Sequence, residues 1–224
     1  MKFTDCFGSI KTSAEFAYRR LEQMIVMLEL APGSHTTEAE LQLKVGVGRT
    51  PVREAIQRLA WEGLLEIRPR AGIAVAKLDG NDWLRTLEVR RHVELVQARA
   101  AARAIDDDAK KTLESALKLL GQAADAGDLA AYAAADKLFD IGMAEASANC
   151  HLVRAVIPLQ THTRRYWIYF HGTVEIRQAL DHHVALAKAV IDRDPGRAVR
   201  EARHLMTYVR DRAEAAVAGE LNVA

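Results

Sequence analysis

The stretch RTPVREAIQRLAWEGLL, residues 49–65, decides the fold of the first third of the chain. A helix is expected to start here with Thr50 as its N-cap and Pro51 as its first residue. It should run to about Glu62, because Gly63 then favours a helix end. Its apolar residues recur at helical spacing and are predicted to form part of a core. They are Val52, Ala55, Ile56 and Leu59.

A second face of this helix carries side chains suited to DNA. Arg53 and Gln57 are four residues apart, just beyond Arg49 and Thr50. Backbone N–H groups and a Thr hydroxyl at a helix N-terminus can hold a phosphate, and an Arg side chain can read guanine in the major groove. A solvated helix face is the alternative interpretation, but the neighbouring elements favour DNA binding.

Two further helices and a hairpin surround this stretch. The apolar pattern predicts a helix over residues 14–30, and a capping box begins a shorter one over residues 37–45. Two short apolar runs, residues 64–67 and 73–75, flank a Pro/Gly turn and indicate a hairpin. A helix, a helix-turn-helix and a hairpin in this order form a winged helix, whose second short helix fits the DNA major groove.

Residues 32–75, PGSHTTEAELQLKVGVGRTPVREAIQRLAWEGLLEIRPRAGIAV, resemble the DNA-binding domain of the GntR family of bacterial transcription regulators. The resemblance is most specific over residues 49–65. It implies a winged helix that contacts operator DNA through its second short helix, with the hairpin tip near the minor groove. The expected DNA-binding residues are Arg49, Thr50, Arg53, Gln57, Arg70 and Gly72.

Two positions depart from the family pattern. Gly48 stands where the family usually has Ser or Thr, which removes one possible phosphate contact. Ala71 stands where relatives often have a basic residue, which weakens the expected contribution of the hairpin. Affinity for DNA should therefore depend strongly on Arg49 and Arg53.

Residues 79–224 show the pattern of helix almost throughout. Breaks in the pattern bound about six helices. We expect them at residues 80–104, 109–123, 128–147, 150–170, 174–192 and 196–218. The fold class is thus mainly α, with a winged helix-turn-helix domain and its small β-hairpin wing over residues 1–78 and an all-helical bundle over residues 79–224.

This second part resembles the all-helical FCD effector domain of the FadR subgroup of GntR regulators. The resemblance rests on Leu87 to Glu94, on Asp136 to Asp140 with Asn149 after it, and on His183 to His204. It implies a domain that binds a small-molecule effector and joins two chains into a homodimer. A two-fold dimer also matches a palindromic operator.

Many FCD domains bind a divalent metal through an Asp-x-x-x-His pair and two later His residues. The resemblance places Asp136, Asp140, His183 and His204 at these positions, where zinc, nickel or manganese would suit the donors. Asp140 stands where the family usually has His, and the spacing from Asp194 to His204 is one residue shorter than the common pattern. Such a set could bind metal with more oxygen character; the alternative is that the site is lost or has another use.

Arg90 is the candidate for effector contact, because an inward Arg in a helical bundle needs an anionic partner. Glu94, one turn further on, is the structural partner, and a carboxylate effector is the alternative. A second group of side chains can either line a pocket or belong to the core or a dimer interface. It consists of Arg164, Arg165, Tyr166, Trp167, Tyr169 and Phe170.

The charge and the motifs of the sequence argue against other classes of protein. The chain has 31 Lys and Arg against 30 Asp and Glu, and this net charge of +1 excludes a uniformly basic nucleic-acid coat. The sequence lacks paired Glu-x-x-His motifs, a nucleophile elbow and a Gly-rich phosphate loop, which argues against a metal-dependent enzyme on a helical bundle. An effector-independent architectural DNA-binding protein would leave the second domain unexplained. We therefore expect no enzyme but a ligand-responsive transcriptional regulator, a repressor released by a small organic acid.

Cysteine usage and hydropathy concern the cellular compartment. Cys6 and Cys150 are far apart and show no Cys-x-x-Cys spacing, so both are expected to be free thiols. No run approaches the length of a membrane span, and residues 1–10 lack the apolar segment of a signal peptide. The expected location is the cytoplasm, with no membrane partner.

Overall fold

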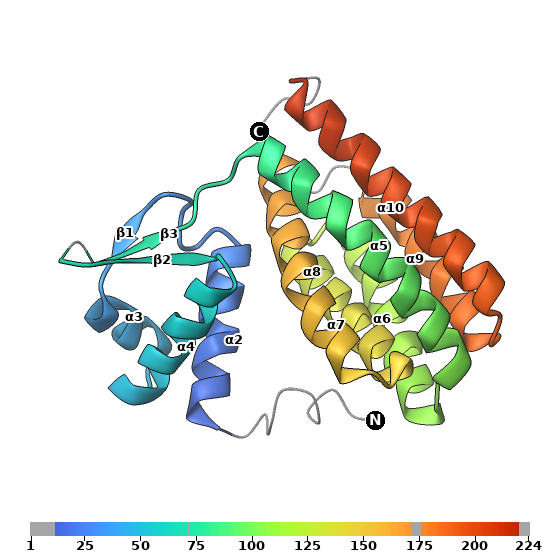
Figure 1. Ribbon diagram of the computed structural model, residues 1–224, viewed down its shortest axis with the longest axis horizontal. Helices are drawn as coiled ribbons and strands as arrows, with labels where there is room; N and C mark the ends of the chain where they lie inside the picture. The colour runs from blue at the N-terminus through green and yellow to red at the C-terminus, as the bar shows by residue number, and fades with distance from the viewer. Residues whose placement is uncertain (1–11, 71, 172–175, 220–224) are drawn as a thin grey trace. The chain divides into compact units, whose positions relative to one another are not determined.

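The computed structural model describes residues 12–70, 72–171 and 176–219 (Figure 1). The described chain divides between Asp79 and Gly80 into two compact units. The first contains three short helices and a small sheet, and the second is described as helices alone. The expected fold class, mainly α with a small hairpin, is confirmed.

The first unit is a winged helix. Its strands form an antiparallel sheet in the order β1-β3-β2, with Ile67 of β2 opposite Ile73 of β3. The strand β1 is absent from the sequence-based prediction, because two residues are too short to show an alternating pattern. The elements are α2 (Ser13–Val26), β1 (His35–Thr36), α3 (Glu38–Val45), α4 (Arg49–Trp61), β2 (Leu65–Arg68) and β3 (Gly72–Val75).

The helix boundaries of this unit follow from local chemistry. The predicted capping box of α3 is present, since Glu40 N–H donates to Thr37 Oγ1 at 3.2 Å and Thr37 N–H donates to Glu40 Oε2 at 2.9 Å. The prediction of Thr50 as the N-cap of α4 is wrong, because extended Gly48 takes that position without a side-chain cap. Pro51 then lies within the first turn, where its missing N–H costs no helical hydrogen bond.

The apolar face predicted for α4 is buried in the core of the winged helix. Val52 and Leu59 are fully enclosed and share this core with Leu21 and Ile25 of α2 and with Leu41 of α3. The packing fixes the rotation of α4 about its axis. As a result, its polar face points away from the core.

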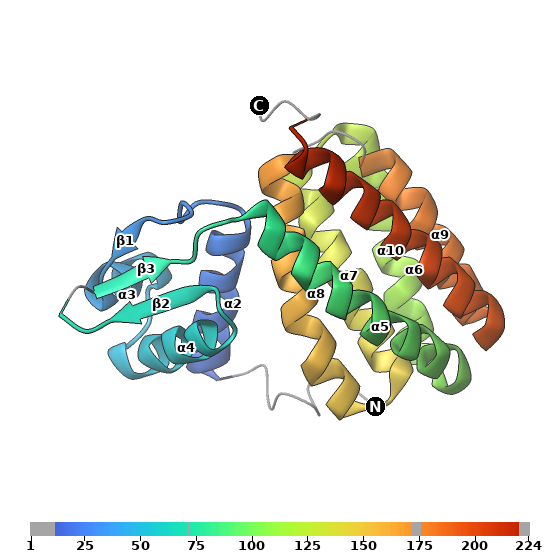
Figure 2. The same ribbon diagram turned by 45° about the horizontal axis from the view of Figure 1, so that its top comes forward.

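The second unit is a bundle of long helices (Figure 2). Helix α5 packs against α7, α8, α9 and α10. Small residues allow close approach of helices: a Cβ added to Gly142 would lie 2.8 Å from a methyl carbon of Leu113. The described helices are α5 (Gly80–Ala104), α6 (Asp107–Ala126), α7 (Leu129–Ser147), α8 (Cys150–Phe170), α9 (Ile176–Ile191) and α10 (Pro195–Val217), within a few residues of the predicted ranges.

Two further observations concern the sequence-based expectations. Within the described ranges, no helix combines the length and the apolar character needed to cross a membrane. Cys150 is disulfide-bonded, so the expectation of a free thiol there is wrong. Cys6 lies outside the described residues.

Candidate functional site

The polar face of α4 is open to solvent. Arg49, Thr50, Arg53 and Gln57 are all exposed, whereas the apolar residues between them are buried. Arg49 Nε donates to Glu38 Oε1 at 2.7 Å, but the Arg49 side chain stays 75% exposed. Such an exposed ion pair is weak, so a phosphate can replace the carboxylate of Glu38 as the partner of Arg49.

A groove lies between this face and the hairpin of β2 and β3. It has a volume of about 340 Å³ and receives Arg53 and Gln57 from α4 and Arg68 and Arg70 from the hairpin. Arg side chains from two elements thus face one concave surface, the arrangement that a phosphate backbone requires. The predicted hairpin residue Gly72 also lines this groove.

Gly72 has a conformational role of its own. Its φ is 85°, and an added Cβ would lie only 2.9 Å from the carbonyl oxygen of Thr36. Arg70 also has a positive φ, 63°, so the turn of the hairpin holds its chain in a conformation that L-residues avoid. Ala71, between these two residues, lies outside the described part.

Arg58 has a structural role in the winged helix. Its guanidinium stacks on the ring of Tyr18 at 3.5 Å from the ring centroid, and it donates to Glu15 at 2.9 Å and to Glu62 at 3.1 Å. Tyr18 Oη donates to the same Glu62 carboxylate at 2.8 Å. The group ties α4 to α2 and fixes the placement of the exposed face.

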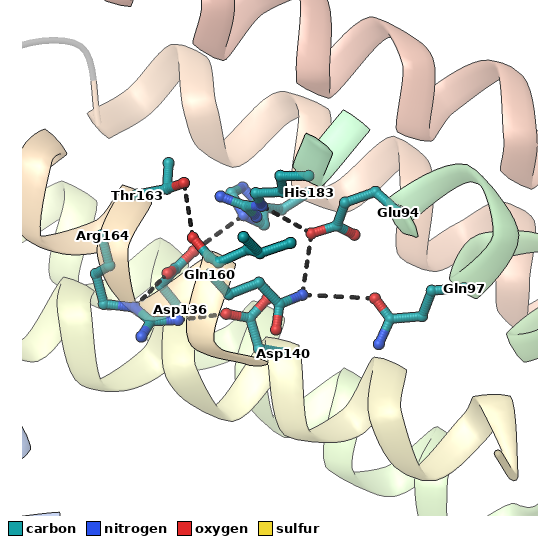
Figure 3. A network of polar contacts seen from close by, with 10 residues as sticks. Glu94, Gln97, Asp136, Asp140, Gln160, Thr163, Arg164 and His183 are labelled. Atoms are coloured by element: carbon teal, nitrogen blue, oxygen red, sulfur yellow. Dashed lines mark hydrogen bonds and ion pairs between the residues drawn. The ribbon is translucent and has the colours of Figure 1, made fainter. Parts of the chain in front are cut away.

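In the helical unit, a buried ion network joins α7, α8 and α9 (Figure 3). Arg164 Nε donates to Asp136 Oδ2 at 2.7 Å, and Arg164 Nη2 donates to Asp140 Oδ2. His183 Nε2 lies 3.1 Å from Asp136 Oδ1, and His183 Nδ1 lies 2.6 Å from the carbonyl oxygen of Ala179. The two carboxylates share one face of α7 because they are four residues apart.

The two carboxylates of this network differ in acidity. Burial opposes ionisation of Asp136, but Arg164 and His183 hold its pKa well below its ordinary range. Burial raises the pKa of Asp140 to about 7, with Asp136 adding to the effect and Arg164 opposing it. Burial also opposes the charged form of His183, yet its hydrogen bond to Asp136 raises its pKa above the ordinary value.

Arg90 lies beside this network. Arg90 Nε donates to Glu94 Oε1 at 2.9 Å. Gln160 Nε2 donates to the same oxygen of Glu94 at 3.0 Å (Figure 3). The structural pairing expected between Arg90 and Glu94 is therefore present.

A small cavity of about 50 Å³ adjoins the network. Its charged and polar lining consists of Arg90, Asp136, Thr163, Arg164 and His183. Most of the remaining wall is apolar or aromatic. Of the side chains expected to line a pocket or the core, Trp167 lines this cavity, whereas Tyr166 and Phe170 stack on Trp83 in the interior.

Comparison with known proteins gives the family. Residues 13–75 match the bacterial regulatory proteins of the gntR family, and residues 85–208, more than half of the chain, match the FCD domain. The chain belongs to the GntR family and carries an FCD domain. Members of this family are transcriptional regulators, and this GntR protein is one of them.

Two curated relatives show the range of similarity. One is an uncharacterized HTH-type transcriptional regulator of Streptomyces ambofaciens, 32% identical over 69% of this chain and 65% of its own length. Another is a probable D-xylose utilization operon transcriptional repressor of Paenarthrobacter nicotinovorans, 27% identical over 82% of this chain and 81% of its own length. The chain thus spans just under two thirds of the first relative and about four fifths of the second.

Solved structures support the same fold. Escherichia coli McbR/YncC is 20% identical, with a TM-score of 0.76 over 94% of this chain and 99% of its own. A GntR regulator from Rhodococcus is also 20% identical, with a TM-score of 0.70 over 93% of this chain and 99% of its own. At this identity the likeness concerns the fold alone.

Of the four expected metal ligands of this GntR protein, Asp136, Asp140 and His183 share the ion network, but His204 lies apart from it. His204 is 63% exposed and lies 3.3 Å from Glu201, while the next residue, Leu205, lines the cavity. The missing residue in the spacing from Asp194 explains this, since a shift of one position rotates a helical side chain by about 100°. The expectation that His204 joins Asp136 and His183 is therefore corrected.

The other three expected ligands are engaged within the protein. The Arg164 guanidinium contacts the carboxylates of Asp136 and Asp140, and both ring nitrogens of His183 face oxygen acceptors. No group of three or more His, Cys, Asp or Glu side chains in the described ranges is arranged to hold a metal ion. These residues, as arranged, do not fit a divalent metal. The sequence placed Arg164 only in a group expected to line a pocket or to belong to the core or a dimer interface. Its pairing with Asp136 and Asp140 could not be predicted, because a partner on another helix leaves no local signal.

Proposed function

We propose that this GntR-family regulator represses an operon by binding a palindromic operator as a homodimer, and that a small organic acid bound in the helical unit releases it. The observation that carries the DNA-binding part is the exposed face of α4 with Arg49, Thr50, Arg53 and Gln57 beside an Arg-lined groove. Such a face can read base edges while the hairpin holds the backbone. DNA binding implies a cytoplasmic location.

The effector part rests on unpaired donors around the cavity. Tyr132 and Trp167 line it, and Tyr132 Oη and Trp167 Nε1 are buried and have no hydrogen-bond partner among the described residues. Burial raises the pKa of Tyr132, so its hydroxyl stays protonated and can donate. Two buried donors without acceptors are costly, and a carboxylate supplies two acceptor oxygens. A thermal-shift screen of short organic acids, with Tyr132→Phe as the comparison, tests this assignment.

Release requires that the effector distinguishes two states of the protein. An acid that binds the DNA-competent and DNA-incompetent states equally would change nothing, however tightly it bound. The apolar walls and the small volume favour an acid with a short apolar body. A metal ion is not part of this proposal, because the donor set does not fit one.

Fluorescence anisotropy with DNA from upstream of the protein's own gene tests the DNA-binding part. Arg53→Ala should cost about 1–3 kcal/mol of discrimination between operator and scrambled DNA if Arg53 reads a base. Arg20→Ala is the matched control, because Arg20 pairs with Glu29 and lies on α2, outside the exposed face of α4. Equal affinity for operator and scrambled DNA in the unmodified protein would contradict the proposal.

A further inference from the structure

Arg164 pairs with Asp136 and Asp140, two of the residues at which the family resemblance places ligands of a divalent metal. We propose that the guanidinium of Arg164 is a built-in replacement for that metal, so that this regulator works without one, and that removing the guanidinium turns Asp136, Asp140 and His183 into a divalent-metal site. The proposal concerns the helical unit alone and does not depend on the proposed DNA-binding function.

The first argument is the position of the guanidinium. Two different nitrogens of Arg164 contact carboxylates that lie one turn apart on α7, so a single cation bridges both. The Arg164 side chain is only 7% exposed. A planar, permanently charged group suits this task because it donates several hydrogen bonds in fixed directions. Buried carboxylates need such a counterion to remain ionised.

Second, both ring nitrogens of His183 are already engaged within the protein. Nδ1 faces the carbonyl oxygen of Ala179 and Nε2 faces the carboxylate of Asp136, and both of these groups can only accept hydrogen bonds. His183 can donate a hydrogen bond to both acceptors only if each of its ring nitrogens carries a proton. The ring then has no lone pair for a metal, whereas a histidine ligand must be neutral.

The third argument is the balance of charge. Arg164 and protonated His183 place two positive charges beside the buried carboxyl groups of Asp136 and Asp140. A divalent ion placed among them would meet two cations at short range and would have to displace both. The guanidinium and a metal are therefore mutually exclusive occupants of this position.

The test compares the full chain with variants at Arg164. The unmodified protein should keep its melting temperature when ZnCl2, NiCl2, MnCl2 or EDTA is added, and should hold no metal by elemental analysis. Arg164→Met should melt at a lower temperature, since two buried carboxylates lose their counterion. Zinc should raise that melting temperature again and should be retained at one ion per chain after gel filtration.

Two controls separate charge from packing. Arg164→Lys keeps a cation and should remain insensitive to zinc. Arg90→Met removes the other arginine that lines the cavity and leaves the pairs of Arg164 intact, so it should also take up no zinc. In the Arg164→Met background, Asp136→Asn should abolish the acquired uptake, because it removes the shared carboxylate.

Two outcomes would overturn the proposal. One is an unmodified protein that carries metal or is stabilised by it, and this arm needs no variant. The other is a folded Arg164→Met protein that takes up no zinc. If that variant cannot be purified, Arg164→Gln replaces it, because glutamine can donate hydrogen bonds but carries no charge. Arg164→Gln should then take up one zinc ion per chain. An unmodified protein that responds to metal would contradict this proposal but not the DNA-binding proposal. A failure to bind operator DNA specifically would contradict the DNA-binding proposal but not this one.

Discussion

Asp140 and Arg164 show how single side chains decide what the centre of the helical unit binds. The sequence shows an aspartate where the family usually has histidine, and this residue alone suggests a metal site richer in oxygen. The structure pairs it instead with Arg164, 24 residues away. A pairing across two helices depends on their packing, so the spacing of residues cannot reveal it. Local spacing does predict the pair of Arg90 and Glu94, which are four residues apart.

The acidity of the network predicts a pH dependence of stability. Burial raises the pKa of Asp140 in the folded protein to about 7. Its contribution to the free energy of unfolding is therefore present in acid and is lost as the pH rises from about 4 to 7. The pKa of His183 is also raised, so its contribution to the free energy of unfolding is lost as the pH rises above 6.5, the ordinary pKa of histidine. The pKa of Asp136 is lowered instead, so its contribution to the free energy of unfolding is present at neutral pH and disappears only in strong acid.

Urea denaturation across this range checks the expectation. The free energy of unfolding of the helical unit should fall between about pH 4 and 7, and Asp140→Asn should make the fall shallower. Glu114→Gln, an exposed carboxylate on α6, serves as the control and should leave the slope unchanged. A fall of the same steepness in Asp140→Asn would assign the dependence to other groups.

Helix α4 and the hairpin are the elements that present the proposed DNA-binding surface. The sequence predicts them well, because apolar spacing, a capping box and a Pro/Gly turn are local signals. It misses β1, which pairs with β3, and it places the N-cap of α4 two residues late. Both errors arise where tertiary packing or the freedom of Gly48 decides the boundary.

The turn of the hairpin provides a prediction at this scale. Gly72→Ala introduces a Cβ at a φ of 85°, 2.9 Å from the Thr36 carbonyl oxygen, so β1 and β3 must move apart. Gly46→Ala is the matched control, since Gly46 has a φ of 77° but no atom within 4 Å of the added carbon.

The control should lose about 1 kcal/mol of stability from backbone strain alone. Gly72→Ala should lose more and should also weaken DNA binding, because the hairpin residues that line the groove shift with it. Chemical denaturation and anisotropy on the same variants provide the comparison. Equal losses of stability in the two variants would show that the contact with Thr36 is unimportant.

The whole molecule joins a winged helix to a helical unit with a small internal cavity within one chain. The residues that line each surface come from several helices, so their convergence follows from the fold and not from any single motif. The near-neutral charge of the chain predicts weak non-specific binding to DNA. Specific affinity must then come from individual placed side chains, and the proposed dimer would double their number.

Footprinting of the DNA upstream of the protein's own gene tests this account most directly. A dimeric, sequence-specific repressor should protect one region made of two inverted half-sites, whose centres are separated by about one helical turn or a multiple of it. Arg53→Ala should remove the protection at concentrations where Arg20→Ala retains it. Uniform protection along the fragment, or a single unrepeated half-site, would contradict the claim that this chain is a dimeric, sequence-specific repressor.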